Sequence, residues 1–167
     1  MQKLRRVEIK KLYKKRANKY NIAFLCNSFE NAVNVGHVFR IAESLGAKVL
    51  LEGRSKTPNN NKFIETTSKG TEKKVVWQYF ENEKVSLEYL KDQEYEIISI
   101  ELSKKAIPLC KFKTSTKKVC FILGAENNGV SEYLLKNSDD QVYIPQFGKG
   151  FSLNTAMSGA IVSYFLI

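Results

Sequence analysis

Residues 119–130 read VCFILGAENNGV, and this stretch sets the class of fold. Its first five residues, Val119–Leu123, form an unbroken apolar run with the length of a buried strand. Gly124 follows the run at once, and Gly129 precedes Val130–Leu135, which is predicted to be a short helix. Fully buried strands that lead directly into helices are typical of parallel sheets. The stretch therefore predicts one strand–turn–helix unit of an α/β domain.

The same alternation extends along the chain on both sides of this unit. The other predicted strands are Ile22–Cys26, Lys48–Leu51, Val75–Phe80, Tyr95–Ile100 and Gln141–Ile144. The other predicted helices are Asn34–Leu45, Ser86–Leu90 and Leu153–Leu166, while Ser55–Asn61 and Ser103–Lys118 are expected to be loops. The pattern predicts an α/β fold in which helices cover both faces of a mostly parallel sheet.

The charge of the chain indicates a polyanionic partner. Its 167 residues fit one domain, and 27 Lys and Arg against 17 Asp and Glu give a net charge of +10. The cations are densest in residues 1–19, where Glu8 is the only acid. We expect a basic helix or arm over residues 1–19 before a main domain over residues 20–167. The arm suits RNA phosphates, although a solvated helix face without a partner has the same composition.

Cysteine content and hydropathy point to a cytoplasmic protein. The three cysteines contain no C-x-x-C pair, so we expect neither a disulfide framework nor a metal site. The first residues are basic without a following apolar run, which argues against a signal peptide. The longest apolar stretch, Ala156–Ile167, is shorter than the roughly 20 residues of a membrane span. We therefore expect a soluble protein of the cytoplasm that makes no membrane contact.

Ligands of open parallel sheets bind beyond the carboxyl ends of the strands, so the segments after the strands are the candidate sites. After Ile22–Cys26, Asn34 is the predicted N-cap of a helix, and Gly36 permits close approach of a backbone. Arg40, six residues beyond Asn34, suits a phosphate, although a capped helix with a surface arginine is the simpler interpretation. His37 is expected to pack or cap rather than to catalyse.

Two further segments carry polar or glycine-rich turns. Between Gly124 and Gly129 stands Glu126, and a ligand could lie against the backbone of Gly124, although a plain strand-to-helix turn also explains the glycines. After Pro145, a glycine-rich loop leads to Ser152, which could cap the final helix. That helix begins with small residues that permit close packing of another backbone: Ala156, Ser158, Gly159 and Ala160.

Taken together and in this order, the three segments resemble the SpoU-type (TrmH-like) RNA ribose 2′-O-methyltransferases of the SPOUT superfamily. The family motif N-x-G-x-x-x-R is matched by Asn34, Gly36 and Arg40. The motif L-G-x-E-x-x-G is matched by Leu123, Gly124, Glu126 and Gly129, and the motif I-P-x-x-G-x-x-x-S-L-N by Ile144, Pro145, Gly148, Ser152, Leu153 and Asn154. A stretch from Gly70 to Trp77 is also similar to the family. His37, Asn127-Asn128 and Thr155-Ala156 depart from its usual residues.

The resemblance implies a fold, a cofactor and an assembly. The implied fold is a parallel α/β sheet whose C-terminal segment forms a trefoil knot. The implied cofactor is S-adenosylmethionine, with backbone contacts at Gly124, Ile144 and Leu153 and with no metal. Relatives are homodimers, and the apolar helix Asn154–Ile167 is the expected interface.

The resemblance also assigns roles to individual side chains. Arg40 would assist deprotonation of the ribose hydroxyl or hold a substrate phosphate. Ser152 and Asn154 would position the RNA or the arginine, while Asn34 and Glu126 would support the site through hydrogen bonds. The expected substrate is tRNA or rRNA, with a slight preference for tRNA. The alternatives are a knotted RNA-binding protein without methylation activity and a SPOUT enzyme that methylates a base.

Overall fold

The structure is a computed structural model that describes residues 5, 7–8, 20–150 and 152–166. Apart from Arg5, Val7 and Glu8, the predicted basic arm lies outside the described residues. The strands are β1 (Asn21–Asn27), β2 (Lys48–Glu52), β3 (Trp77–Phe80), β4 (Glu96–Ile100), β5 (Ile107–Pro108), β6 (Lys118–Leu123) and β7 (Asp140–Tyr143). The helices are α2 (Ala32–Leu45), α3 (Lys62–Ser68), α4 (Glu83–Asp92), α5 (Glu132–Asn137) and α6 (Thr155–Leu166), with 3₁₀ turns η1 (Thr71–Lys73) and η2 (Leu109–Lys111).

The strands form one seven-stranded sheet in the order β3-β2-β1-β6-β4-β7-β5, and every adjacent pair runs parallel. The central pair, β1 and β6, is aligned from Asn21 beside Lys118 to Cys26 beside Leu123. Because all the strands point the same way, their carboxyl ends meet at one edge of the sheet. This arrangement confirms the predicted parallel α/β fold.

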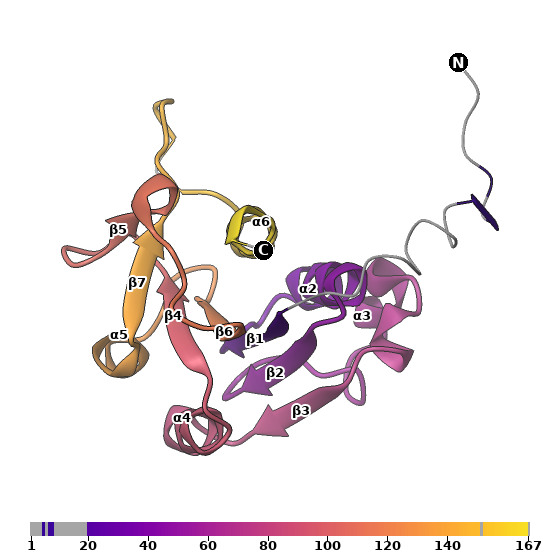
Figure 1. Cartoon of the computed structure of the whole chain (residues 1–167). Coiled ribbons are helices and arrows are strands. Elements are labelled where there is room, and N and C mark those ends of the chain that lie inside the picture. The colour runs from indigo at the N-terminus through magenta and orange to yellow at the C-terminus, as the bar shows by residue number, and fades with distance from the viewer. Residues whose placement is uncertain (1–4, 6, 9–19, 151, 167) are drawn as a thin grey trace.

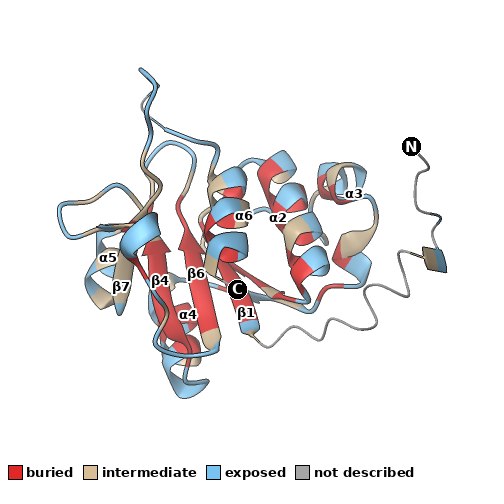
Figure 2. Cartoon of the chain, turned by 45° about the horizontal axis from the view of Figure 1, so that its top comes forward, coloured by how far each residue is buried: buried red, intermediate tan, exposed pale blue. Residues whose placement is uncertain are grey.

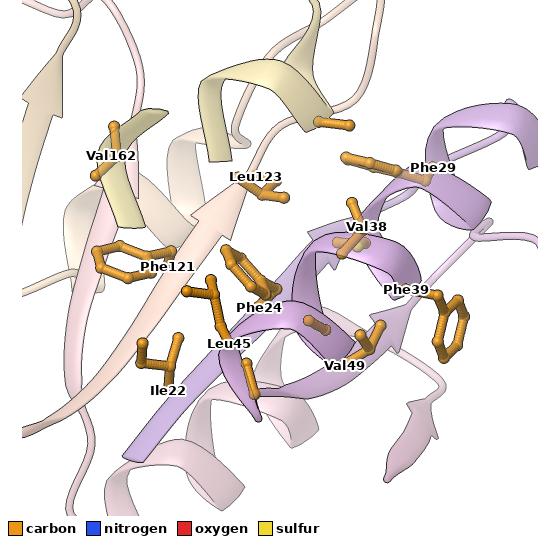
Figure 3. Packing of buried hydrophobic residues seen from close by; sticks show 14 of the residues in the cluster. Ile22, Phe24, Phe29, Val38, Phe39, Leu45, Val49, Phe121, Leu123 and Val162 are labelled. Atoms are coloured by element: carbon orange, nitrogen blue, oxygen red, sulfur yellow. The ribbon is translucent and has the colours of Figure 1, made fainter. Parts of the chain in front are cut away.

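Helices cover both faces of the sheet, and each face has its own apolar core (Figure 1). On β1, Phe24 points to the face covered by α2, α3 and α6, while Leu25 points to the face covered by α4 and α5. In Figure 2 the buried sides of α2 and α6 lie against the sheet and their outer sides are exposed. Figure 3 shows Phe24 and Phe121 side by side on neighbouring strands, with ring centroids 6.0 Å apart.

Two elements were missed by the sequence analysis. Helix α3 follows directly after the expected loop Ser55–Asn61, and it buries only Ile64 and Ser68, too few residues to give a helical pattern. Its position depends on Gly36 of α2, because a Cβ there would lie 2.6 Å from the Cβ of Thr67. Strand β5 lies inside the expected loop Ser103–Lys118, and two residues are too few for any periodicity.

The expected strand Val75–Phe80 begins two residues late, at Trp77. The backbone N–H of Val75 instead donates to the carbonyl of Thr71, which completes the turn η1. Within the described parts of the chain, no helix combines the length and the apolar character needed to cross a bilayer.

We predict that Phe24→Ala lowers the free energy of unfolding by about 3–5 kcal/mol, because Phe24 is fully buried between the sheet and α6. Phe63→Ala is the matched control, since Phe63 is 70% exposed, and it should change stability by less than about 0.5 kcal/mol. Urea unfolding followed by circular dichroism measures both. Equal losses for the two variants would contradict the assigned core.

Candidate active site at the carboxyl edge of the sheet

A pocket of about 970 Å³ lies at the carboxyl ends of β4, β6 and β7. Its lining comes from four segments and from Leu135 of α5. The segments lie within residues 100–103 at the end of β4, 124–130 after β6, 143–150 at the end of β7, and 152–158 at the start of α6. Gly124, Ile144 and Leu153 are all part of this lining. The turns that the sequence singled out are therefore brought together in one pocket.

The wall after β6 is a tight turn made by backbone atoms. Ala125 and Gly129 exchange two backbone hydrogen bonds, of 3.0 and 2.9 Å. A Cβ on Gly124 would lie 2.2 Å from the carbonyl carbon of Gly129 and 2.3 Å from the amide nitrogen of Val130. Gly129 has a φ of 66°, in the left-handed region that favours glycine. Gly124 is thus required by the turn itself, which agrees with the simpler of the two explanations for this glycine, and its backbone also lines the pocket.

The prediction that Asn34 caps helix α2 is wrong. The helix begins at Ala32, and the side chain of Asn31 is the cap, accepting a hydrogen bond from the backbone of Val33. Asn34 therefore lies in the first turn with its side chain buried. This frees its amide group for long-range contacts.

The amide of Asn34 connects the other two motifs. Its nitrogen donates to a carboxylate oxygen of Glu126 at 2.7 Å, and its oxygen accepts from the amide nitrogen of Asn154 at 2.8 Å. The three residues are up to 120 positions apart in the chain. They form one hydrogen-bonded chain beside the pocket, which Glu126 and Asn154 line.

Helix α6 is capped by Asn154 and not by Ser152. The Asn154 side-chain oxygen accepts from the backbone N–H groups of Ala156 and Met157, while Ser152 is exposed in the pocket lining. Next to the cap, the hydroxyl of Thr155 donates to the carbonyl of Gly124 at 2.9 Å. Asn154 thus fixes the start of α6 and joins it to Asn34 at the same time.

Arg40 is not part of the pocket within this chain. It is exposed on α2, it makes no ion pair within the described residues, and it is absent from the pocket lining. Arg40 follows Asn34 by six residues, which in an α-helix is a rotation of roughly 240° around the axis and a rise of about 9 Å. The two side chains therefore face different directions. His37 is also exposed and outside the lining.

Two residues that sequence reasoning missed support the far side of the turn. The side-chain oxygen of Asn27, at the end of β1, accepts from the backbone N–H of Ser131 at 2.9 Å. Glu101, directly after β4, accepts from the backbone N–H of Val130 at 2.9 Å. Both lie at the carboxyl end of a strand, which was the available signal, but neither lies in a recognised motif.

Other polar and ionisable groups are less suited to chemistry. The thiols of Cys26 and Cys120 are buried, and burial raises the pKa of each above the ordinary value, which keeps them protonated. Burial also raises the pKa of Glu52, whose carboxylate accepts a hydrogen bond from Asn27. Among the residues that the structure describes, no cluster of His, Cys, Asp and Glu is arranged to hold a metal ion.

A parallel sheet covered on both faces, with a pocket lined by the turns at its carboxyl edge, defines a protein of the α/β class. The chain belongs to the SpoU rRNA Methylase family, whose sequence model matches residues 21–164. This assignment agrees with the motifs of the three segments.

The individual relatives described next share about a quarter of their residues with this chain over the matched region. The chain is 28% identical over 152 residues to an uncharacterised tRNA/rRNA methyltransferase of Borreliella burgdorferi, covering 91% of this chain and 65% of that protein. It is 26% identical over 163 residues to the tRNA (guanosine(18)-2′-O)-methyltransferase of the same organism, covering 98% and 72%. A match to the 23S rRNA (guanosine-2′-O-)-methyltransferase of Acinetobacter baylyi spans only 53% of that enzyme, at 25% identity and 78% of this chain.

Solved structures share the fold. An rRNA methyltransferase from Sinorhizobium meliloti with bound S-adenosylmethionine superposes with a TM-score of 0.80 at 18% identity, covering 87% of this chain and 55% of that one. The TrmH/SpoU tRNA modifying enzyme of A. aeolicus gives 0.74 at 22% identity, covering 94% and 81%. At these identities the likeness establishes the architecture.

We predict that Asn34→Asp lowers the free energy of unfolding by about 1.5–3 kcal/mol, because a carboxylate would face Glu126 in place of a donor. Asn31→Asp is the matched control on the same helix, since aspartate caps as well as asparagine, and it should be neutral within about 0.5 kcal/mol. Urea unfolding of the two variants is the measurement. Equal stability of Asn34→Asp and the wild type would show that the interaction with Glu126 does not support the fold.

Proposed function

We propose that the protein transfers the methyl group of S-adenosylmethionine to a ribose 2′-hydroxyl of RNA. The hydrogen-bonded chain of Asn34, Glu126 and Asn154 carries this proposal, because it joins one residue from each of the three family motifs at the pocket. Family membership supports the reaction. The net charge of +10 supports an RNA substrate.

The pocket suits the proposed cofactor. Its volume of about 970 Å³ lies at the upper end of the range for small-molecule sites, roughly 300–1,000 Å³. The turns at Gly124, Ile144 and Leu153 are part of its lining, so their backbone groups are available to the nucleoside part of the cofactor. The carboxylates of Glu101 and Glu126 are suitable partners for hydroxyl and ammonium groups.

When bound, S-adenosylmethionine supplies an activated methyl group, so the protein must orient the ribose hydroxyl and help remove its proton. Ser152 is exposed in the lining and is suited to contact the RNA. Asn34 and Asn154 hold the carboxylate of Glu126 and the start of α6 in place. Arg40 completes the site by holding a phosphate of the RNA and assisting loss of the proton.

We place Arg40 in the pocket of a second copy of the chain. It is exposed on α2, next to α6, where the hydroxyls of Ser44 and Tyr164 lie 3.0 Å apart. Helix α6 exposes large apolar side chains on one side, spaced three and four residues apart. They are Met157 (62% exposed), Ile161 (41%), Tyr164 (55%) and Phe165 (54%). Such a stripe suits a homodimer interface that brings the α2 of one copy to the pocket of the other.

The threading of the chain is a further part of the proposal. Strand β7 lies between β4 and β5, but α6, which follows it, packs against β6 and α2. Residues 144–150 and 152–154 therefore lead from the end of β7 to the start of α6 across the carboxyl edge of the sheet, where the segments after β4 and β6 also lie. This crossing supports the trefoil knot that the family resemblance implies.

The proposed target is a tRNA or an rRNA. The similarity to tRNA and rRNA methyltransferases supports one of these two classes, and we prefer tRNA because of the Gly70–Trp77 stretch and the relative that covers 98% of the chain. We place the reaction in the cytoplasm, in keeping with three free cysteines.

The reaction is tested by incubating the protein with labelled S-adenosylmethionine and total RNA, followed by alkaline digestion of the product. A 2′-O-methyl group blocks cleavage at its site, whereas a methylated base does not. Label in an alkali-sensitive position would favour a base methyltransferase, and cofactor binding without label transfer would favour an RNA-binding protein.

We predict that Arg40→Ala slows methylation by about 10²–10⁴-fold, the usual contribution of a group that assists proton transfer. Cofactor affinity should be unchanged, because the proposed partners of Arg40 are the RNA phosphate and the ribose hydroxyl and not the cofactor. Arg54→Ala is the control, since Arg54 is an exposed arginine paired with Glu30 at 3.1 Å and should have no effect. Unimpaired turnover by Arg40→Ala would refute the role.

Mixed dimers test whether Arg40 acts in the pocket of its own chain or in the pocket of the partner. Arg40→Ala chains combined with pocket-defective Glu126→Ala chains contain one complete site only if Arg40 acts across the interface. Activity that returns on mixing therefore supports action in the partner's pocket, and mixtures as inactive as their components contradict it.

We predict that Ile161→Glu prevents dimer formation at micromolar concentration and abolishes methylation, because it places a charge in the apolar stripe of α6. Val76→Glu is the control, since Val76 is 68% exposed outside α6. Sedimentation velocity measures both variants. A fully dimeric Ile161→Glu protein would remove α6 as the interface.

A further inference from the structure

Glu101, directly after β4, lines the same pocket as Glu126 and Asn154. One of its carboxylate oxygens accepts from the backbone N–H of Val130 at 2.9 Å, and the other accepts from the N–H of Leu102 at 2.9 Å. A Cβ on Gly129 would lie 2.1 Å from the first oxygen, so the carboxylate packs directly against the turn after β6. The geometry holds a half-buried charge in a fixed position on the pocket wall.

The pocket is acidic although the protein is strongly basic. Among the described residues that line it, Glu101 and Glu126 are the only charged side chains, and no lysine or arginine is present. Lys104 and Lys149 lie in the loops next to the lining, but both are exposed and outside it. The charges that this chain contributes to the described lining are therefore all negative, within a chain of net charge +10.

The proposed reaction changes the charge of the ligand. The bond between sulfur and the methyl carbon breaks with its electron pair left on sulfur, while a new bond forms between that carbon and the ribose 2′-oxygen. The hydroxyl proton leaves to a base or to solvent. S-adenosylmethionine, with its sulfonium cation, thus becomes the neutral thioether S-adenosylhomocysteine, and the ligand loses one positive charge.

We propose that Glu101 is a specificity-determining residue that favours the sulfonium cofactor over its thioether product by charge. This inference rests on the proposed function. The two ligands have nearly the same shape, so contacts with the backbone turns bind both about equally and cannot separate them. A fixed carboxylate separates them by the one charge in which they differ. It attracts the sulfonium cation of the cofactor, and this attraction is absent for the neutral thioether product. The effect weakens product binding relative to cofactor binding.

A substitution at Glu101 tests this effect of charge more directly than a substitution at Glu126. Glu126 is held by Asn34, so changing it also disrupts the connection between the three motifs. Glu101→Gln keeps the size of the side chain and one oxygen that accepts from Val130, but it removes the charge and puts an amide nitrogen, which cannot accept, beside the N–H of Leu102. The ratio of dissociation constants, rather than any single affinity, therefore reports the effect of the charge. Glu132→Gln is the matched control, because Glu132 is an exposed residue of α5, outside the pocket lining, and the variant has the same net charge.

The test is calorimetric titration of wild type, Glu101→Gln and Glu132→Gln with three ligands in the absence of RNA. The ligands are S-adenosylmethionine, S-adenosylhomocysteine and sinefungin, in which a protonated amine replaces the sulfonium. The ratio of the product dissociation constant to the cofactor dissociation constant should fall about threefold to tenfold in Glu101→Gln. Sinefungin should follow the cofactor, and Glu132→Gln should match the wild type.

The outcomes separate this inference from the proposed function. If the wild type binds none of the three ligands, the proposed function itself fails. If the wild type binds them and Glu101→Gln leaves the ratio unchanged, or weakens all three ligands equally, only the role of Glu101 in charge selection is overturned.

A measurement without any variant gives a second check. The wild-type ratio should fall as sodium chloride is raised, because salt screens the attraction between a half-exposed carboxylate and a cation. A ratio independent of salt would contradict the inference even if Glu101→Gln does not fold.

Discussion

The buried side-chain amide of Asn34 holds together three segments that are remote in sequence, and the pocket depends on this group. Its nitrogen and oxygen both have a partner, Glu126 on one side and Asn154 on the other. An amide is suited to this position because it donates and accepts at once, whereas a carboxylate can only accept. With Asn154 also capping α6, one short chain of hydrogen bonds fixes a helix start, a turn and the end of a loop.

The sheet supplies the scaffold on which this chain of hydrogen bonds can form. Parallel strands end at one edge, so the turns after β4, β6 and β7 converge there although they are far apart in the sequence. The turn after β6 is tight because Gly124 lacks a Cβ, and Glu101 and Asn27 hold its far end through backbone hydrogen bonds. The part of the pocket wall after β6 is therefore fixed by backbone hydrogen bonds.

Charge is distributed unevenly between the surface and the pocket. The chain has an excess of lysine and arginine, while its pocket has only the carboxylates of Glu101 and Glu126 among the described lining residues. On the proposed function, this separation is useful, since a basic surface attracts RNA phosphates and an acidic pocket attracts a cationic cofactor. Arg40 is exposed on the surface of its own chain, in keeping with the proposed role toward RNA at the pocket of a second copy.

The sequence by itself determined the strands, the parallel sheet, and the glycine and asparagine motifs, because apolar runs and turn residues are local signals. It also determined the family, through the order of those motifs. Tertiary structure decided which residues meet. Asn31 caps α2, so that the side chain of Asn34 is available for long-range contacts, and Glu101 accepts from the backbone of Val130, 29 positions away. It also decided that α3 and β5 form, since α3 buries only two of its residues and β5 has only two residues, so that neither gives a periodic pattern. Contacts between distant residues depend on the direction and spacing of whole elements, and no local pattern contains that information.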